Sequence, residues 1–332
     1  MDVSVVVSFV LMSLLYVVPF FFIHALAKKL ERYFRVRSML FFIGATFAII
    51  SFVLLFLDSA INPASLELGS GVYLSYINLA GAFFSALASF CFYTLTEAIK
   101  KAMNMRQRTI SSEIFFIAVF FAIYYTLSLT TMGWGAALSM SLNFLLSLAA
   151  FLMLFLSFLD LSEIYGALCP WCRIPALVAS YLTLWNAFYQ PFAFLNYVIP
   201  VEAPAVLYDA QTTITVTIIV LLTLPAWSML KSLRVKVKSG DDEVSIFLSR
   251  MSDIIGGSTM TILKRAIEEY NGRERTAISY DPEKGLSNGT ADFVEFMVSY
   301  FEKLIGPVAR RIFAESGIKA KPEQRGNASK SS

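Results

Sequence analysis

Two cysteines three positions apart carry the most specific chemical motif in this sequence. Cys169-Pro-Trp-Cys172 stands just before a long apolar stretch, and Arg173 follows it directly. A Cys-x-x-Cys pair suits either a dithiol that cycles with a disulfide or half of a tetrahedral zinc site. A helix N-terminus and an adjacent cation both stabilise a thiolate. Two other interpretations stay open: inert cysteines at the membrane interface, which we favour, and attachment of a lipid.

A zinc site at Cys169 and Cys172 needs two further ligands. The sequence holds one other cysteine, Cys91, and a single histidine, His24, both expected near the inner ends of apolar stretches. The sequence therefore allows a Cys3His set at the inner face of a membrane. A lone histidine on an apolar helix is more often a hydrogen-bonded side chain, and we expect that role for His24. We expect no cofactor.

Seven apolar stretches of membrane-spanning length occur within the first 230 residues. Hydrophobic residues make up 57% of the chain and charged residues only 15%, whereas a soluble domain is about a quarter charged. A spanning helix needs about 20 mostly apolar residues. The stretches that meet this length are 3–27, 38–57, 72–99, 114–132, 136–159, 174–199 and 212–230. The sequence predicts an all-α polytopic membrane protein built on a seven-helix transmembrane bundle.

The segments between these stretches alternate in charge. The segments 58–71, 133–135 and 200–211 contain no Lys or Arg, whereas the other loops are basic. Basic residues near the ends of transmembrane segments stay on the cytoplasmic side. We therefore predict a multi-pass protein of the cell membrane with its N-terminus outside and its C-terminus in the cytoplasm. The basic residues expected at the membrane surface, in contact with anionic lipid headgroups, are Lys28, Lys29, Arg32, Arg35, Arg37, Lys100, Lys101, Arg106 and Arg108.

Ionisable residues deep inside spans commonly mark ion or proton pathways. The sequence places Asp58 in an outer loop and puts none at the middle of a span. The acidic residues expected near the inner ends are Glu97, Glu113, Asp160 and Glu163. This placement argues against proton-coupled or ion-driven transport.

The carboxyl-terminal part has a different composition. Residues 239–332 carry 13 basic and 14 acidic residues, so this part has no basic excess that would favour nucleic acid. We predict four regions: a transmembrane domain over 1–230, a basic linker over 231–242, a small, mostly helical cytoplasmic domain over 243–318, and a disordered tail over 319–332. The tail is polar and rich in Lys, Ser, Gln and Gly.

Local signals predict four helices within residues 243–318. Apolar residues from Val244 to Ile255 recur at helical spacing, and Gly256-Gly257 should end that helix. Ser258 is expected to cap the next helix, and Thr290 to open the one after it. Between these two helices, residues 271–289 are rich in turn formers, with one short strand expected over 276–280. A last helix should begin at Gly306-Pro307.

No catalytic signature accompanies this architecture. The sequence lacks a P-loop and the kinase motifs, so we lean against an enzyme. The leading hypothesis is a membrane sensor or receptor-like protein that couples the seven-helix bundle to a cytoplasmic interaction domain. The first alternative is a structural or assembly subunit of a membrane complex, and the second is a thiol or metal enzyme that uses Cys169 and Cys172. Expected partners are the lipid bilayer and another protein, bound through 243–318 or the bundle. An oligomer is also possible.

Overall fold

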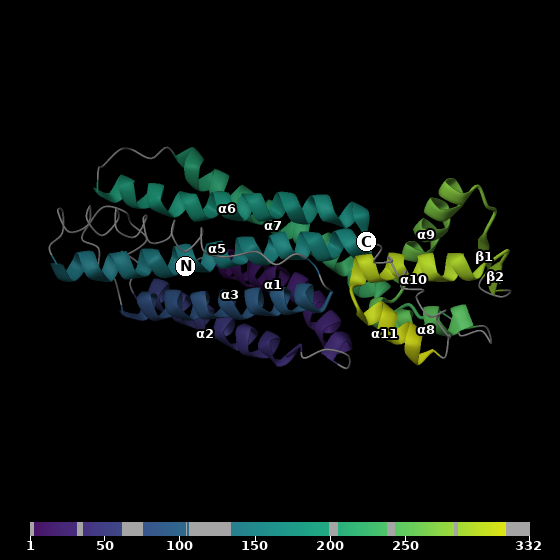
Figure 1. Ribbon diagram of the computed structural model, residues 1–332. Helices are drawn as coiled ribbons and strands as arrows, with labels where there is room; N and C mark the ends of the chain where they lie inside the picture. The colour runs from purple at the N-terminus through teal and green to yellow at the C-terminus, as the bar shows by residue number, and fades with distance from the viewer. Residues whose placement is uncertain are drawn as a thin grey trace, which may run out of the picture. The chain divides into compact units, whose positions relative to one another are not determined.

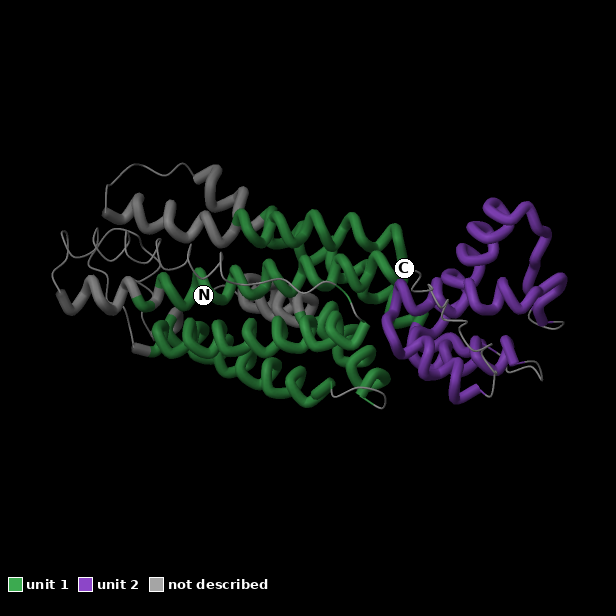
Figure 2. The backbone as a smooth tube through the Cα atoms, viewed as in Figure 1, with its two compact units in different colours: residues 1–232 green, residues 233–332 purple. Residues whose placement is uncertain are grey.

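The chain divides into two compact units, Met1–Ser232 and Leu233–Ser332 (Figure 2). The computed structural model describes residues 3–31, 36–61, 76–103, 105, 134–198, 205–237, 243–281 and 285–316, with side-chain detail for most of them. These residues form ten helices and one two-stranded sheet.

Unit 1 consists of long helices that run side by side (Figure 1). They are α1 (Val3–Glu31), α2 (Met39–Ile61), α3 (Tyr76–Ala102), α5 (Trp134–Leu168), α6 (Pro170–Val198) and α7 (Ala205–Ser232). The principal neighbours are α2 with α3, α3 with α5, α5 with α6, α6 with α7, and α7 with α1. Since α1 also contacts α3, these packed pairs close into a bundle.

Four helices of unit 1 are long and apolar enough to cross a membrane. The qualifying segments are Met39–Asp58, Ile77–Ala102, Phe144–Leu168 and Thr213–Ser232. The predicted span 114–132 lies outside the described residues, and the side chains of α1 and α6 are described only in part. The described part of the chain is thus a mostly helical protein with four candidate spans. The seven-span count remains a prediction.

The second half of α1 forms the core of unit 1. Phe20, Phe22 and Leu26 on this half-helix are each at most 1% exposed. The ring of Phe20 stacks on Phe92 of α3 with centroids 4.0 Å apart, and the ring of Phe22 packs against Tyr165 of α5 at 5.2 Å. Aromatic pairs at these separations contribute about 0.5–1.5 kcal/mol beyond the area that they bury. These rings join α1 to α3 and α5.

The outward faces of the unit 1 helices are apolar. On α6, large exposed side chains recur three or four residues apart from Trp171 to Trp185, and α2 carries a similar series from Met39 to Leu57. On α7 the series includes Leu224 and Trp227, exposed by 64% and 68%. Contiguous apolar surface of this extent is rare on a soluble monomer. The exterior of unit 1 therefore matches a lipid environment, in agreement with the candidate spans.

Small residues allow α2 and α3 to pack closely. A Cβ atom at Gly81 would lie 2.8 Å from Cδ2 of Leu55, so a side chain there would require Leu55 to move. Beside it, the Ser51 hydroxyl donates to the carbonyl of Gly81 at 2.8 Å. Membrane helices commonly combine small residues with such hydroxyl hydrogen bonds.

Unit 2 is a small helical fold with one hairpin. Its elements are α8 (Glu243–Ile255), α9 (Ser258–Glu274), β1 (Ser279–Asp281), β2 (Gly285–Ser287), α10 (Ala291–Ile305) and α11 (Val308–Glu315). The core contains Phe247, whose ring meets those of Phe301 and Phe313 edge-on at 5.5 and 5.7 Å. All four helices predicted in this region are present. The predicted disordered tail lies outside the described residues.

Two local predictions for unit 2 were wrong. Ser258 does not cap α9: the N-cap is Gly257, and no side chain caps it. The predicted turn at Asn271-Gly272 is helical, because α9 continues to Glu274 and ends with Arg275 in the left-handed region at φ 53°. The Asn271 amide explains the extension. It donates to the carbonyl of Ile278 at 2.8 Å and accepts from the Ile278 N–H at 3.0 Å. This pairing attaches the end of α9 to the segment that leads into β1.

Candidate functional site

The turn between α5 and α6 consists of a single residue, Cys169. The Cys169 N–H donates to the carbonyl of Tyr165 at 2.6 Å and so continues the hydrogen bonding of α5. Its own carbonyl accepts from the N–H of Cys172 at 3.1 Å, which begins α6. Pro170 takes the first helical position, where its missing N–H costs no hydrogen bond. This sharp corner holds both cysteines in one turn of backbone.

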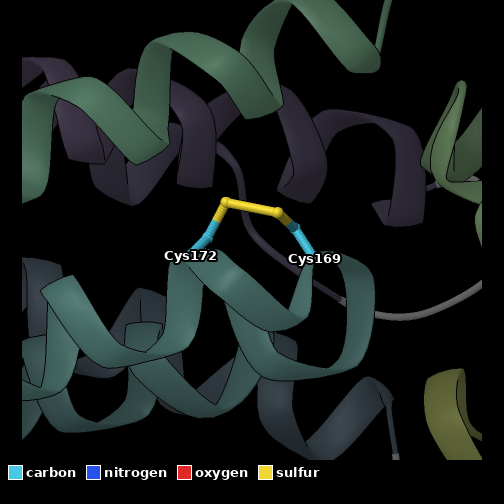
Figure 3. The surroundings of a disulfide bond; sticks show 2 residues. All are labelled: Cys169 and Cys172. Atoms are coloured by element: carbon cyan, nitrogen blue, oxygen red, sulfur yellow. A yellow bond between two sulfur atoms is a disulfide. The ribbon is translucent and has the colours of Figure 1, made fainter.

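Cys169 and Cys172 form a disulfide across this corner (Figure 3). Their Cα atoms lie 5.4 Å apart, within the usual range for the bond. Figure 3 shows both side chains on the same side of the corner, directed toward one another. Cys172 is fully buried, whereas Cys169 is partly exposed. The structure thus brings the two sequence-predicted residues together in a disulfide.

The structure does not assemble the predicted Cys3His zinc set. Nowhere in the described ranges do three or more His, Cys, Asp or Glu residues gather as metal ligands. Cys91 lies on α3 and packs against α2. A Cβ atom built at Gly44 of α2 would lie 3.1 Å from the Cβ atom of Cys91. His24 donates from Nδ1 to the carbonyl of Ser38 at 3.3 Å, which confirms its predicted hydrogen-bonding role. Its ring also stacks on Phe41 at 4.8 Å.

The last turns of α5 make a buried support for the corner. Tyr165 is 0% exposed, and its hydroxyl has no hydrogen-bond partner among the described residues. Beside it, a Cβ at Gly166 would lie 2.9 Å from Cδ of Arg173, so the Arg173 side chain folds back from α6 onto α5. Trp171, in the first turn of α6, is 58% exposed. The corner therefore presents Trp171 outward while Tyr165 and Cys172 face inward.

A buried ion cluster joins α3 to α5. Nζ of Lys100 lies 2.7 Å from the Asp160 carboxylate and 2.7 Å from that of Glu163. The exposed fractions of the Lys100 and Asp160 side chains are 1% and 4%, and that of Glu163 is 32%. Two carboxylates and one ammonium at these distances form charge-assisted hydrogen bonds that fix the two helices relative to one another.

Burial of Lys100 corrects its assignment as a membrane-surface base. The helix α3 continues past residue 99 to Ala102 and carries the ammonium inward to the two carboxylates of α5. Sequence reasoning missed this cluster because it treated each span end separately. Asp160 and Glu163 lie three residues apart, hence on one helical face. That spacing, opposite a lysine at the end of another span, was the available signal.

A second polar pair joins α2 to α3. Asp58 was expected in an outer loop, but it belongs to α2 and is 3% exposed. Its carboxylate accepts a hydrogen bond from Nδ2 of Asn78 on α3 at 3.1 Å. A buried carboxylate needs such partners, since desolvation without them is costly. The prediction of an outer-loop Asp58 was therefore wrong.

The remaining predicted surface bases divide into two groups. Lys28, Arg37 and Lys101 are exposed, and Lys29 is partly exposed. Their position on the outside of unit 1 is compatible with contact to lipid headgroups, which the structure does not contain. The other four lie outside the described residues: Arg32, Arg35, Arg106 and Arg108.

No protein-family model, curated protein or solved structure matches the chain. The corner offers a disulfide between one partly exposed and one buried cysteine. The ion cluster places fixed charges between α3 and α5. The helix α5 also leads into the corner.

Proposed function

We propose that the chain is a membrane sensor in which a helical bundle acts on a C-terminal interaction unit. The bundle has seven spans, an outside amino terminus and a cytoplasmic C-terminal unit. The charge alternation of the loops supports this orientation, and the candidate spans and apolar exterior of unit 1 support membrane insertion. The partner on the cytoplasmic side is a protein that binds unit 2.

One observation carries the proposal: a single chain combines two compact units of opposite character. Unit 1 exposes large apolar side chains such as Ile49, Ile174 and Trp227, whereas unit 2 encloses its large apolar side chains in a core of its own. An anchor alone does not need a second folded unit. Unit 2 also holds the chain that enters it, because the Val237 N–H donates to Oγ of Ser252 at 3.0 Å. This hydrogen bond attaches the segment that follows α7 to unit 2.

The coupling can be tested without knowing the ligand. Glu163→Gln weakens the ion cluster of the bundle, and Lys101→Met changes a nearby exposed base as the control. Hydrogen exchange of residues 243–316 is measured on both full-length variants in lipid nanodiscs. Coupling free energies between sites typically correspond to changes of about fivefold or more. We expect a change of that size in Glu163→Gln alone. Unchanged exchange in unit 2, together with altered exchange in α3 and α5, would contradict a sensor.

The topology and the alternative function need separate measurements. An impermeant protease or label applied to intact cells should not reach residues 243–316; digestion of that unit from outside rejects the orientation. Mild detergent extraction followed by gel filtration distinguishes a sensor from an assembly subunit. A stoichiometric partner that stays bound throughout indicates the subunit. A lone protein whose thermal stability rises with a small ligand indicates the sensor.

A further inference from the structure

We propose that Cys169 and Cys172 form a reversible thiol–disulfide exchange site whose substrate is a dithiol reductant that attacks Cys169. This inference does not depend on the sensor function. It rests on three features of the α5–α6 corner: the existing disulfide, the unequal exposure of the two cysteines, and their position at the start of α6.

The unequal exposure determines which sulfur is attacked. Cys172 is 0% exposed, so no external thiolate reaches it in the folded protein. Cys169 is partly exposed, and its neighbours Pro170 and Arg173 are exposed. Exchange requires direct attack of a thiolate on a disulfide sulfur, and its rate depends on access. The incoming dithiol therefore meets Cys169 first, while Cys172 serves as the buried, resolving cysteine.

The start of α6 stabilises a thiolate on either cysteine, and so favours both Cys172 and Cys169 as leaving groups. Cys169 takes the position before the first helical residue, and Cys172 lies in the first turn. The partial positive charge of a helix N-terminus stabilises an anion there, and thiolates of Cys-x-x-Cys motifs benefit from it. The hydrogen bond from the Cys172 N–H to the Cys169 carbonyl, 3.1 Å long, keeps the two residues within one turn. Reclosure is consequently intramolecular.

The reaction proceeds in two exchanges. First, a thiolate of the dithiol attacks Sγ of Cys169, the Cys169–Cys172 bond breaks, and its electron pair leaves on Sγ of Cys172, which takes up a proton. Second, the other thiolate of the reductant attacks the reductant sulfur that is bonded to Cys169. Cys169 then leaves as a thiolate and is protonated. Two electrons and two protons pass from the dithiol to the protein, and the dithiol becomes a disulfide.

The first test asks whether the bond opens in the folded protein. Full-length Cys91→Ser protein in nanodiscs is treated with dithiothreitol, quenched with acid, denatured and alkylated with a maleimide–polyethylene glycol. We expect a shift from no added group to two, reversed by oxidised dithiothreitol, with the thermal unfolding of the protein little changed. A disulfide that resists dithiothreitol until denaturant is added is purely structural, and a pair that fails to reclose is not an exchange site. Either result overturns the proposal.

The second test asks which sulfur reacts. Cys172→Ser and Cys169→Ser, both in the Cys91→Ser background, each leave one thiol for reaction with Ellman's reagent. Because Cys169 is partly exposed and Cys172 is buried, we expect Cys169 to react about tenfold faster or more. Brief iodoacetamide treatment of the reduced Cys91→Ser protein, followed by peptide mass spectrometry, gives the same comparison without altering either cysteine. Equal labelling, or faster labelling of Cys172, contradicts the assignment.

Discussion

At the scale of single residues, the most consequential side chain in unit 1 is Lys100. Its ammonium lies 2.7 Å from each of two carboxylates and is almost fully enclosed. Replacing one partner of a buried ion pair is much more damaging than replacing the whole pair by apolar groups, because the remaining charge stays in a low-dielectric site. The packing of α3 against α5 therefore depends on keeping all three charged partners, even if the whole cluster adds little net stability.

Lys100→Met should strongly destabilise unit 1. Loss of one partner from a buried pair costs about 3–5 kcal/mol, and the measurement is reversible unfolding of the full chain in mixed detergent micelles. Lys101→Met is the matched control, since this neighbour is exposed and a surface change usually stays within about 0.5 kcal/mol. Lys100→Met combined with Asp160→Leu should recover part of the loss. Equal stability of the two single lysine variants would mean that the cluster is solvated.

Tyr300 in unit 2 gives the protein an alkaline dependence of stability. Burial, followed by the negative charge of Glu269, raises the pKa of Tyr300 above its usual value, and nearby Arg265 partly opposes this. The folded state therefore keeps the proton more tightly than the unfolded chain. The resulting stabilisation is fully present below the unfolded pKa of about 10 and is lost as the pH rises through the folded value.

Tyr300→Phe should accordingly flatten the fall in stability above about pH 10, because phenylalanine has no proton to lose. The measurement is the midpoint of urea unfolding of unit 2 within the full chain at a series of alkaline pH values. Glu269→Gln should lower the pKa of Tyr300 toward its usual value, as observed by NMR of labelled tyrosine. A pKa that does not move in Glu269→Gln rules out the carboxylate as a cause.

At the scale of elements, α10 shows a helix whose start is specified locally. Thr290 has extended backbone angles, and its hydroxyl accepts from the N–H of Phe293 at 3.2 Å. At the other end, the N–H of Gly306 donates to the carbonyl of Glu302, and φ of 79° at Gly306 turns the chain toward α11. Both ends use residues whose preferences act without distant contacts. The sequence predicted that Thr290 opens this helix, whereas Gly306 was expected to begin the next one.

Thr290→Ala should remove about 1 kcal/mol from unit 2, because one N–H at the start of α10 loses its acceptor. Ser299→Ala, at an exposed position inside the same helix, should change the stability little. Hydrogen exchange of residues 291–305 in the full chain measures both, with the largest effect in the first turn. A uniform effect along the whole of α10 would point to global destabilisation instead of a lost cap.

The ends of elements could be predicted where local sequence preference determines them. They were predicted wrongly where a contact with a distant residue determines them. The span predicted over 136–159 is part of α5, which extends to Leu168 because Asp160 and Glu163 find Lys100 on α3. Asn271-Gly272 resembles a turn, yet the helix α9 continues because Asn271 pairs with Ile278. The disulfide follows the same distinction: the spacing of Cys169 and Cys172 indicated a possible pair, whereas their unequal burial depends on the surrounding helices.

At the scale of the whole molecule, the surface of unit 2 suits water, whereas the surface of unit 1 suits lipid. Water drives burial of apolar side chains in unit 2, where Phe247, Met251 and Phe293 are all 0% exposed. In unit 1 the exterior is apolar, so its helices associate through close packing, aromatic contacts and enclosed polar pairs such as Asp58 with Asn78. A denaturant added to the water should therefore affect the stability of unit 2 more than that of unit 1.

Urea should consequently unfold unit 2 before unit 1 in the full chain held in nanodiscs. Urea acts in proportion to the surface that unfolding exposes to water, and unit 2 exposes its entire core, whereas the outward faces of unit 1 remain against lipid. Hydrogen exchange along a urea series should show residues 243–316 losing protection together, while 144–183 stays protected. Thr290→Ala should move the first transition to lower urea, and Lys100→Met should move the second. A single midpoint shared by both regions would show that the two units unfold as one cooperative structure.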